Sequence, residues 1–148
     1  MGWLESLLRY RNERDELIRL RHGLEYNNAT FKEKTADLSK RSQEYRDAVN
    51  EGANEHYLMS AEIAEIETAQ MLRKAARWRI HVPLRPTNED DTEMWEWNVI
   101  HGRHYLSEKA MMQIRRDAYQ EFEMRSKPWL SWMAILISII SLVVSVLR

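Results

Sequence analysis

The chain has 148 residues, no cysteine, and only 4 glycines and 3 prolines. Without cysteine there is no disulfide framework and no thiolate metal or redox site, which is typical of a reducing compartment. Because glycine and proline are the residues that most often interrupt regular structure, their scarcity makes long helices the expected default. Glycine-rich phosphate loops, nucleophile elbows and His-Glu-x-x-His motifs are also absent. We therefore expect neither an enzymatic activity nor a cofactor.

No charge of either sign predominates. The sequence has 22 lysines and arginines against 23 aspartates and glutamates, a formal net charge of −1. A protein that binds nucleic acid usually carries a basic excess, so no nucleic-acid partner is expected. The first 20 residues lack the apolar stretch of a secretory signal peptide. These features favour a protein whose polar part stays in the cytoplasm.

The last residues, 128–148, form a long hydrophobic run that is uncharged until Arg148. As a helix, the run would be roughly 28 Å long, close to the thickness of the hydrocarbon core of a bilayer. Its flanks carry the basic and aromatic residues typical of membrane interfaces: Arg125, Lys127, Trp129, Trp132 and Arg148. We predict a transmembrane anchor over 128–148, with a lipid bilayer as partner.

Two details of this anchor follow from the flanking residues. Pro128 suits the first turn of a new helix, so the preceding helix is expected to end near Ser126 or Lys127. More basic residues precede the run than follow it, which places the preceding part of the chain on the cytoplasmic side. The predicted location is therefore the inner membrane, in a single pass.

Small residues recur within the hydrophobic run at steps of three and four. On a helix they would occupy an arc of roughly 80°; they are Ser131, Ala134, Ser138, Ser141 and Ser145. Such a stripe lets two helices approach closely, so we predict a self-association face and a homo-oligomer. The alternative is that the serine hydroxyls bond to carbonyls of their own helix and have no further role.

A seven-residue repeat runs through the first third of the chain. Its members are Trp3, Tyr10, Leu17, Leu24, Phe31, Leu38 and Tyr45. This spacing predicts a coiled-coil seam. The row four residues further along is mostly polar, with Arg14, Arg21 and Asn28. A seam of this kind suits either a helix packed on a neighbouring helix along a narrow stripe or a weak coiled coil.

Residues 1–79 are predicted to form a helical hairpin or coiled coil. The run 50–54, which contains Gly52, has the composition of a turn, and the second helix is expected from about 55 to 79. Gly23 and the pair Asn27–Asn28 would either break the first helix or leave it as a continuous rod.

The next two segments differ in pattern. Residues 80–94 contain Pro83, Pro86 and an acidic run, and they read as a linker. Residues 95–127 begin with Trp95 and Trp97 alternating with polar residues, as in a small β-hairpin, and continue as a juxtamembrane helix capped by Ser107. The predicted fold class is thus mainly α, with a small β-hairpin, a juxtamembrane helix and one transmembrane helix.

One group of side chains has the composition of a metal site. It consists of His101 and His104, with Glu93, Glu96 and Glu108 close in sequence. Two histidines without further spaced ligands are a weak pattern for zinc. We therefore predict no metal and no catalytic residues.

The sequence resembles a group of uncharacterised bacterial proteins over residues 95–148. The similarity rests on Arg103–Lys109 (RHYLSEK), on Ile114-Arg115-Arg116, and on Glu121 and Glu123 ahead of the apolar run. Ala110 stands where that pattern has glycine. The resemblance implies a helical soluble domain with a single C-terminal membrane helix, and it transfers no activity.

The combined features predict a tail-anchored scaffold or adaptor. It would self-associate through the heptad seam and the small-residue face, and a further protein partner stays open. The alternative function is a membrane-perturbing or pore-forming effector gated by the helical domain.

Overall fold

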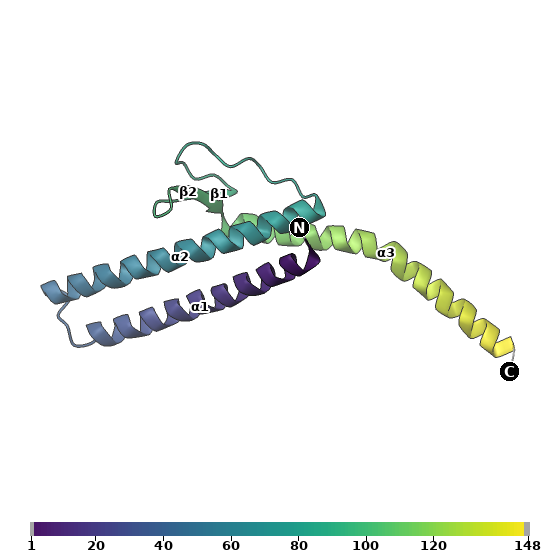
Figure 1. The fold of residues 1–148 in the computed structure, drawn as a ribbon, viewed down its shortest axis with the longest axis horizontal. Helices are drawn as coiled ribbons and strands as arrows, with labels where there is room; N and C mark the ends of the chain where they lie inside the picture. Colours follow the sequence, from purple (N-terminus) through teal and green to yellow (C-terminus); the bar gives the residue numbers. More distant parts are fainter. Residues whose placement is uncertain (1, 147–148) are drawn as a thin grey trace.

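The structure is a computed structural model that describes residues 2–146, without the side chains of residues 143 and 146. It contains helix α1 (Trp3–Thr35), helix α2 (Gln43–Trp78), strands β1 (Trp95–Asn98) and β2 (Arg103–Leu106), and helix α3 (Glu108–Val146). Helices α1 and α2 lie side by side as a long antiparallel hairpin, and the strands lie against α2 (Figure 1). The predictions of a mainly helical fold and a small antiparallel sheet are confirmed.

The turn of the helical hairpin lies earlier than predicted. It spans residues 36–42, and α2 begins at Gln43, capped by the hydroxyl of Ser42, which accepts a hydrogen bond of 3.1 Å from the backbone N–H of Tyr45. Gly52 and its neighbours, predicted as the turn, lie inside α2. A hydroxyl at the N-cap position accepts a hydrogen bond from an N–H that would otherwise be unpaired, so Ser42 fixes the start of α2. Gly52, in contrast, does not end a helix.

Helix α1 is a single continuous helix. It passes through Gly23, Asn27 and Asn28 without a break, which settles the choice between a rod and two helices. A glycine inside a helix costs about 1 kcal/mol relative to alanine, an amount that packing along a long neighbouring helix can offset.

The compact core lies where α2, the sheet and the start of α3 meet. Trp95, Leu106 and Ile114 are buried there between the small side chains of Ala75 and Ala110. The two alanines allow α2 and α3 to approach closely, and the tryptophan fills the space beside them. The indole N–H of Trp95 donates a hydrogen bond of 3.2 Å to the carbonyl of Pro83, so the linker is held against this core.

The sheet is a β-hairpin in which Trp95 pairs with Leu106 and Asn98 with Arg103. Gly102 turns the chain with a φ of +57°, a conformation that favours glycine. The backbone N–H of Leu106, at the edge of the sheet, donates a buried hydrogen bond of 2.9 Å to the hydroxyl of Thr68 on α2. This bond fixes the hairpin on α2.

Helix α3 begins where the sequence predicted. The hydroxyl of Ser107 accepts a hydrogen bond of 3.1 Å from the N–H of Ala110, as an N-cap does, and it also donates to the carbonyl of Glu93. The helix does not end at Lys127, however, but continues through Pro128 to Val146. Proline removes one backbone hydrogen bond and bends a helix without always ending it. Figure 1 shows that α3 is bent.

Among the residues that the structure describes, none of the helices combines the length and the hydrophobicity that a membrane-spanning segment requires. This finding corrects two predictions, the transmembrane helix over 128–148 and the single-pass location in the inner membrane. The apolar run is part of a longer helix, α3, whose residues before Pro128 include many charged side chains.

We expect Thr68→Val to destabilise the fold by about 1–3 kcal/mol, because it leaves the N–H of Leu106 buried without an acceptor. The measurement is the free energy of unfolding from chemical denaturation. Thr35→Val is the matched control, since the hydroxyl of Thr35 donates to the carbonyls of Phe31 and Lys32 in its own helix and so links no second element. Equal effects of the two substitutions would contradict the role given to Thr68.

Candidate self-association surfaces

The predicted heptad seam lies mainly inside the helical hairpin. Leu17 is buried, and Leu24 and Phe31 are half-buried on the side of α1 that faces α2. The first two members, Trp3 and Tyr10, are exposed near the free end of α1. The last two members, Leu38 and Tyr45, lie in the turn and in α2. The central residues of the seam therefore pack against α2 of the same chain.

The second row of the seam is not the one that the sequence indicated. Leu20 and Asn27 are buried and Glu13 is half-buried, so the companion row lies three residues after the seam, not four. The rows three and four residues away flank the seam on opposite sides of a helix. The position of the partner helix selects between them, and the sequence of one helix does not contain that information.

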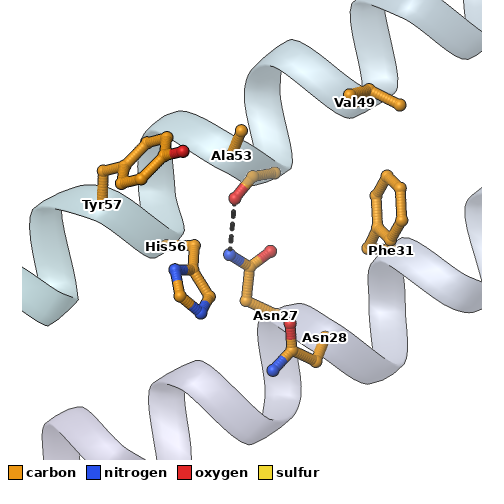
Figure 2. Close-up of a pocket in the computed structure, with 8 residues that line it drawn as sticks. Asn27, Asn28, Phe31, Val49, Ala53, His56 and Tyr57 are labelled. Atoms are coloured by element: carbon orange, nitrogen blue, oxygen red, sulfur yellow. Dashed lines mark hydrogen bonds between the residues drawn. The ribbon is translucent and has the colours of Figure 1, made fainter.

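Glycine and a buried amide bring the two helices together at the centre of the hairpin. A Cβ on Gly52 would lie 3.2 Å from the ring of Phe31, and one on Gly23 would lie 2.9 Å from the sulfur of Met59. Beside this contact the side-chain N–H of Asn27 donates a hydrogen bond of 3.1 Å to the carbonyl of Gly52 (Figure 2). The glycines that predicted a break therefore mark a close approach between helices.

A cavity of about 310 Å³ opens beside this contact, between α1 and α2. Figure 2 shows Phe31 and Asn27 of α1 facing His56 and Val49 of α2 across it.

Ion pairs between the centre of the hairpin and the free end of α1 favour one register of the two helices. The guanidinium of Arg21 lies 2.6 Å from the carboxylate of Glu67. Nearer the free end of α1, the carboxylate of Glu13 accepts hydrogen bonds from Arg73 and Gln70. These pairs are partly exposed, so each contributes about 1 kcal/mol at most, and together they favour one alignment over a shifted one.

The predicted small-residue face lies on the exposed end of α3. We call residues 129–145 the α3 tail; the tail projects away from the hairpin (Figure 1), and its described side chains are all exposed. Ser131, Ala134 and Ser145 are among them. The hydroxyls of Ser138 and Ser141 donate hydrogen bonds of 2.9 Å to the carbonyls of Ala134 and Ile137 in their own helix. Any contact along this face would therefore rest on the small size of the serines, because these hydroxyls are already bonded.

The residues predicted for a membrane interface lie around the bend of α3. Arg125 stacks on the ring of Trp78 at 5.5 Å, and Lys127 lies 2.9 Å from the carboxylate of Glu123. Trp129 and Trp132 are exposed by 67% and 66%. The fifth predicted residue, Arg148, lies outside the described residues.

The histidines of the β-hairpin take structural contacts. His104 is buried, with a ring nitrogen 3.1 Å from the carbonyl of Asp90. A ring nitrogen of His101 lies 2.5 Å from the hydroxyl of Tyr105 and 3.6 Å from the carboxylate of Glu65. Burial, together with the nearby charge of Glu65, raises the pKa of Tyr105 above its usual value. Within residues 2–146 no group of three or more histidines and carboxylates is placed to hold a metal ion.

Comparisons of the chain with models of known families, with curated proteins and with solved structures give no match.

We expect Gly23→Ala to stabilise the protein by about 0.5–1 kcal/mol, because alanine favours the helix and only the flexible end of Met59 has to move. Gly52→Ala is the comparison, since there the added methyl group meets the rigid ring of Phe31 and the gain is offset. The midpoints of thermal unfolding measure both effects. A larger gain for Gly52→Ala would contradict the close contact with Phe31.

Proposed function

We propose that the protein is a self-associating helical scaffold, assembled through the α3 tails of several copies. The observation that carries this proposal is the exposure of the tail's large apolar side chains, from Leu130 at 63% to Leu142 at 68%. In water, a continuous apolar surface of this extent marks an interaction site.

The energy available from covering the tail is large. Burying one side chain of leucine or isoleucine size contributes about 1.5–3 kcal/mol. Association of two molecules costs about 4–15 kcal/mol in lost freedom of motion. Contact through a handful of the tail's side chains, such as Ile135, Ile139 and Leu142, is enough to offset this cost.

A second copy of the chain suits the tail as a partner for two reasons. The small-residue face gives each helix a shallow groove beside bulky ridges, so two identical helices fit each other at close distance. The charges that precede the tail are also neutralised within α3: Glu121 lies 4.0 Å from Arg125, and Glu123 lies 2.9 Å from Lys127. Copies of α3 would therefore meet without strong repulsion between like charges.

The helical hairpin has a different role in this proposal. Because Leu17, Leu20 and Asn27 face α2 within the same chain, the centre of the seam is not free to pair with another copy. The hairpin is then a stiff arm that the assembled tails would hold at high local concentration, where even weak contacts between arms become significant.

Replacing the small residues separates a specific contact from non-specific aggregation. We expect the double substitution Ser138→Leu and Ser141→Leu to abolish a discrete oligomer, because the larger side chains fill the groove. The matched variant, Leu136→Ser with Ile140→Ser, changes the opposite side of the tail and should keep that oligomer. Sedimentation velocity of the full chain gives the oligomeric state, and circular dichroism verifies that the helices are intact.

Two outcomes would contradict the proposal. If the unaltered chain is monomeric at micromolar concentration, the tails do not assemble. If association instead rises with added leucine and falls with added serine, it follows total hydrophobicity, and the small-residue face has no special role.

A further inference from the structure

The end of α2 that lies beside the start of α1 is strongly basic. Residues 70–81 include Arg73, Lys74, Arg77 and Arg79 and no acidic residue. Arg73 pairs with Glu13 of α1, but neither Lys74 nor Arg77 has a carboxylate partner in the part of the chain that the structure describes. The turn at the opposite end of the hairpin, by contrast, mixes both signs, with Asp37 near Lys40 and Arg41.

This basic end has an apolar groove. The groove holds about 610 Å³ between the first turns of α1 and the last turns of α2. Tyr10, Met71 and Trp78 supply its apolar lining, and Lys74 and Arg77 lie beside them. The groove thus brings cationic and aromatic side chains onto one surface.

Exposed apolar residues from α1 extend this surface. Trp3, Leu4, Leu7 and Leu8 are exposed by 75%, 66%, 48% and 58%. Because α1 and α2 are antiparallel, these residues lie near the end of α2. Helix α3 joins the surface on the other side of Trp78, where the ring of Phe122 lies 6.1 Å away and Arg125 stacks at 5.5 Å.

We infer that this basic end of the hairpin, formed by Trp3, Leu7, Lys74 and Arg77, binds the surface of a bilayer that contains anionic lipids. Tryptophan and leucine side chains enter the boundary between headgroups and acyl chains, and each nearby lysine or arginine contributes about 1 kcal/mol with anionic headgroups. The contact is peripheral and needs no segment that spans the bilayer. It uses residues outside the α3 tail and goes beyond the proposed self-association.

The chemistry of the surface favours a lipid partner over an acidic protein or a nucleic acid. The exposed leucines at the start of α1 can enter the apolar part of a bilayer. A nucleic acid is contacted mainly through its phosphates and would leave Leu4, Leu7 and Leu8 in water. Three acidic residues near this surface are already engaged: Glu13 pairs with Arg73, Glu121 lies 4.0 Å from Arg125, and Glu5 accepts a hydrogen bond of 3.2 Å from the backbone of Gly2. None of the three therefore opposes an anionic surface strongly.

Vesicle flotation with the full chain tests the inference. The probes are vesicles of neutral phosphatidylcholine and vesicles that also contain phosphatidylserine. We expect tighter binding to the anionic vesicles, weakened at least about tenfold by Lys74→Glu with Arg77→Glu. The matched control, Lys40→Glu with Arg41→Glu, makes the same change of net charge at the far end of the hairpin and should bind within about twofold of the unaltered chain.

Three results would overturn the inference: equal binding to neutral and anionic vesicles, equal losses in the two charge-reversed variants, or preference for a nucleic-acid duplex over anionic vesicles at the same ionic strength. Replacing Trp3 and Leu7 with alanine gives a second test and should weaken binding even where charge is unchanged. Self-association is measured without lipid and depends on other residues, so either idea can fail while the other stands.

Discussion

The packing of α2 on two opposite sides is the constraint on which the rest of the structure depends. One side receives α1, through the contact between Gly52 and Phe31 and the bond from Asn27. The other side receives the β-hairpin, through the buried bond between Thr68 and Leu106, and α3, through the alanines of the core. A helix used twice in this way needs small residues along both sides, and α2 has them.

This arrangement places the compact core at one region of an extended molecule. The core around Trp95 and Ile114 fixes the direction in which α3 starts. The rest of α3 continues from there as one helix, held by its own backbone hydrogen bonds. The apolar tail is thereby carried away from every element able to cover it. The proposed assembly through the tail and the proposed lipid contact at the basic end of the hairpin both follow from apolar surface that the chain does not cover itself.

Sequence patterns predicted the secondary structure correctly where it depends on interactions between residues close together along the chain. Ser107 marked the start of α3, and the alternation around Trp95 with the glycine at 102 marked the β-hairpin. Signals that depend on a distant partner misled. Gly52 predicted a turn but packs against Phe31, Pro128 predicted a helix end but lies within α3, and the apolar run predicted a spanning helix where the described residues contain none.

The sequence by itself determined that the protein is mainly helical, where its strands and the cap of α3 lie, and which segments are apolar or basic, because these properties depend on residues close together along the chain. Only the tertiary structure decided which row of α1 is buried, which carboxylates neutralise which cations, and which apolar residues stay uncovered. Those outcomes depend on helices brought together from distant parts of the chain, where one close contact, such as that of Gly52 with Phe31, selects the alignment for all the others.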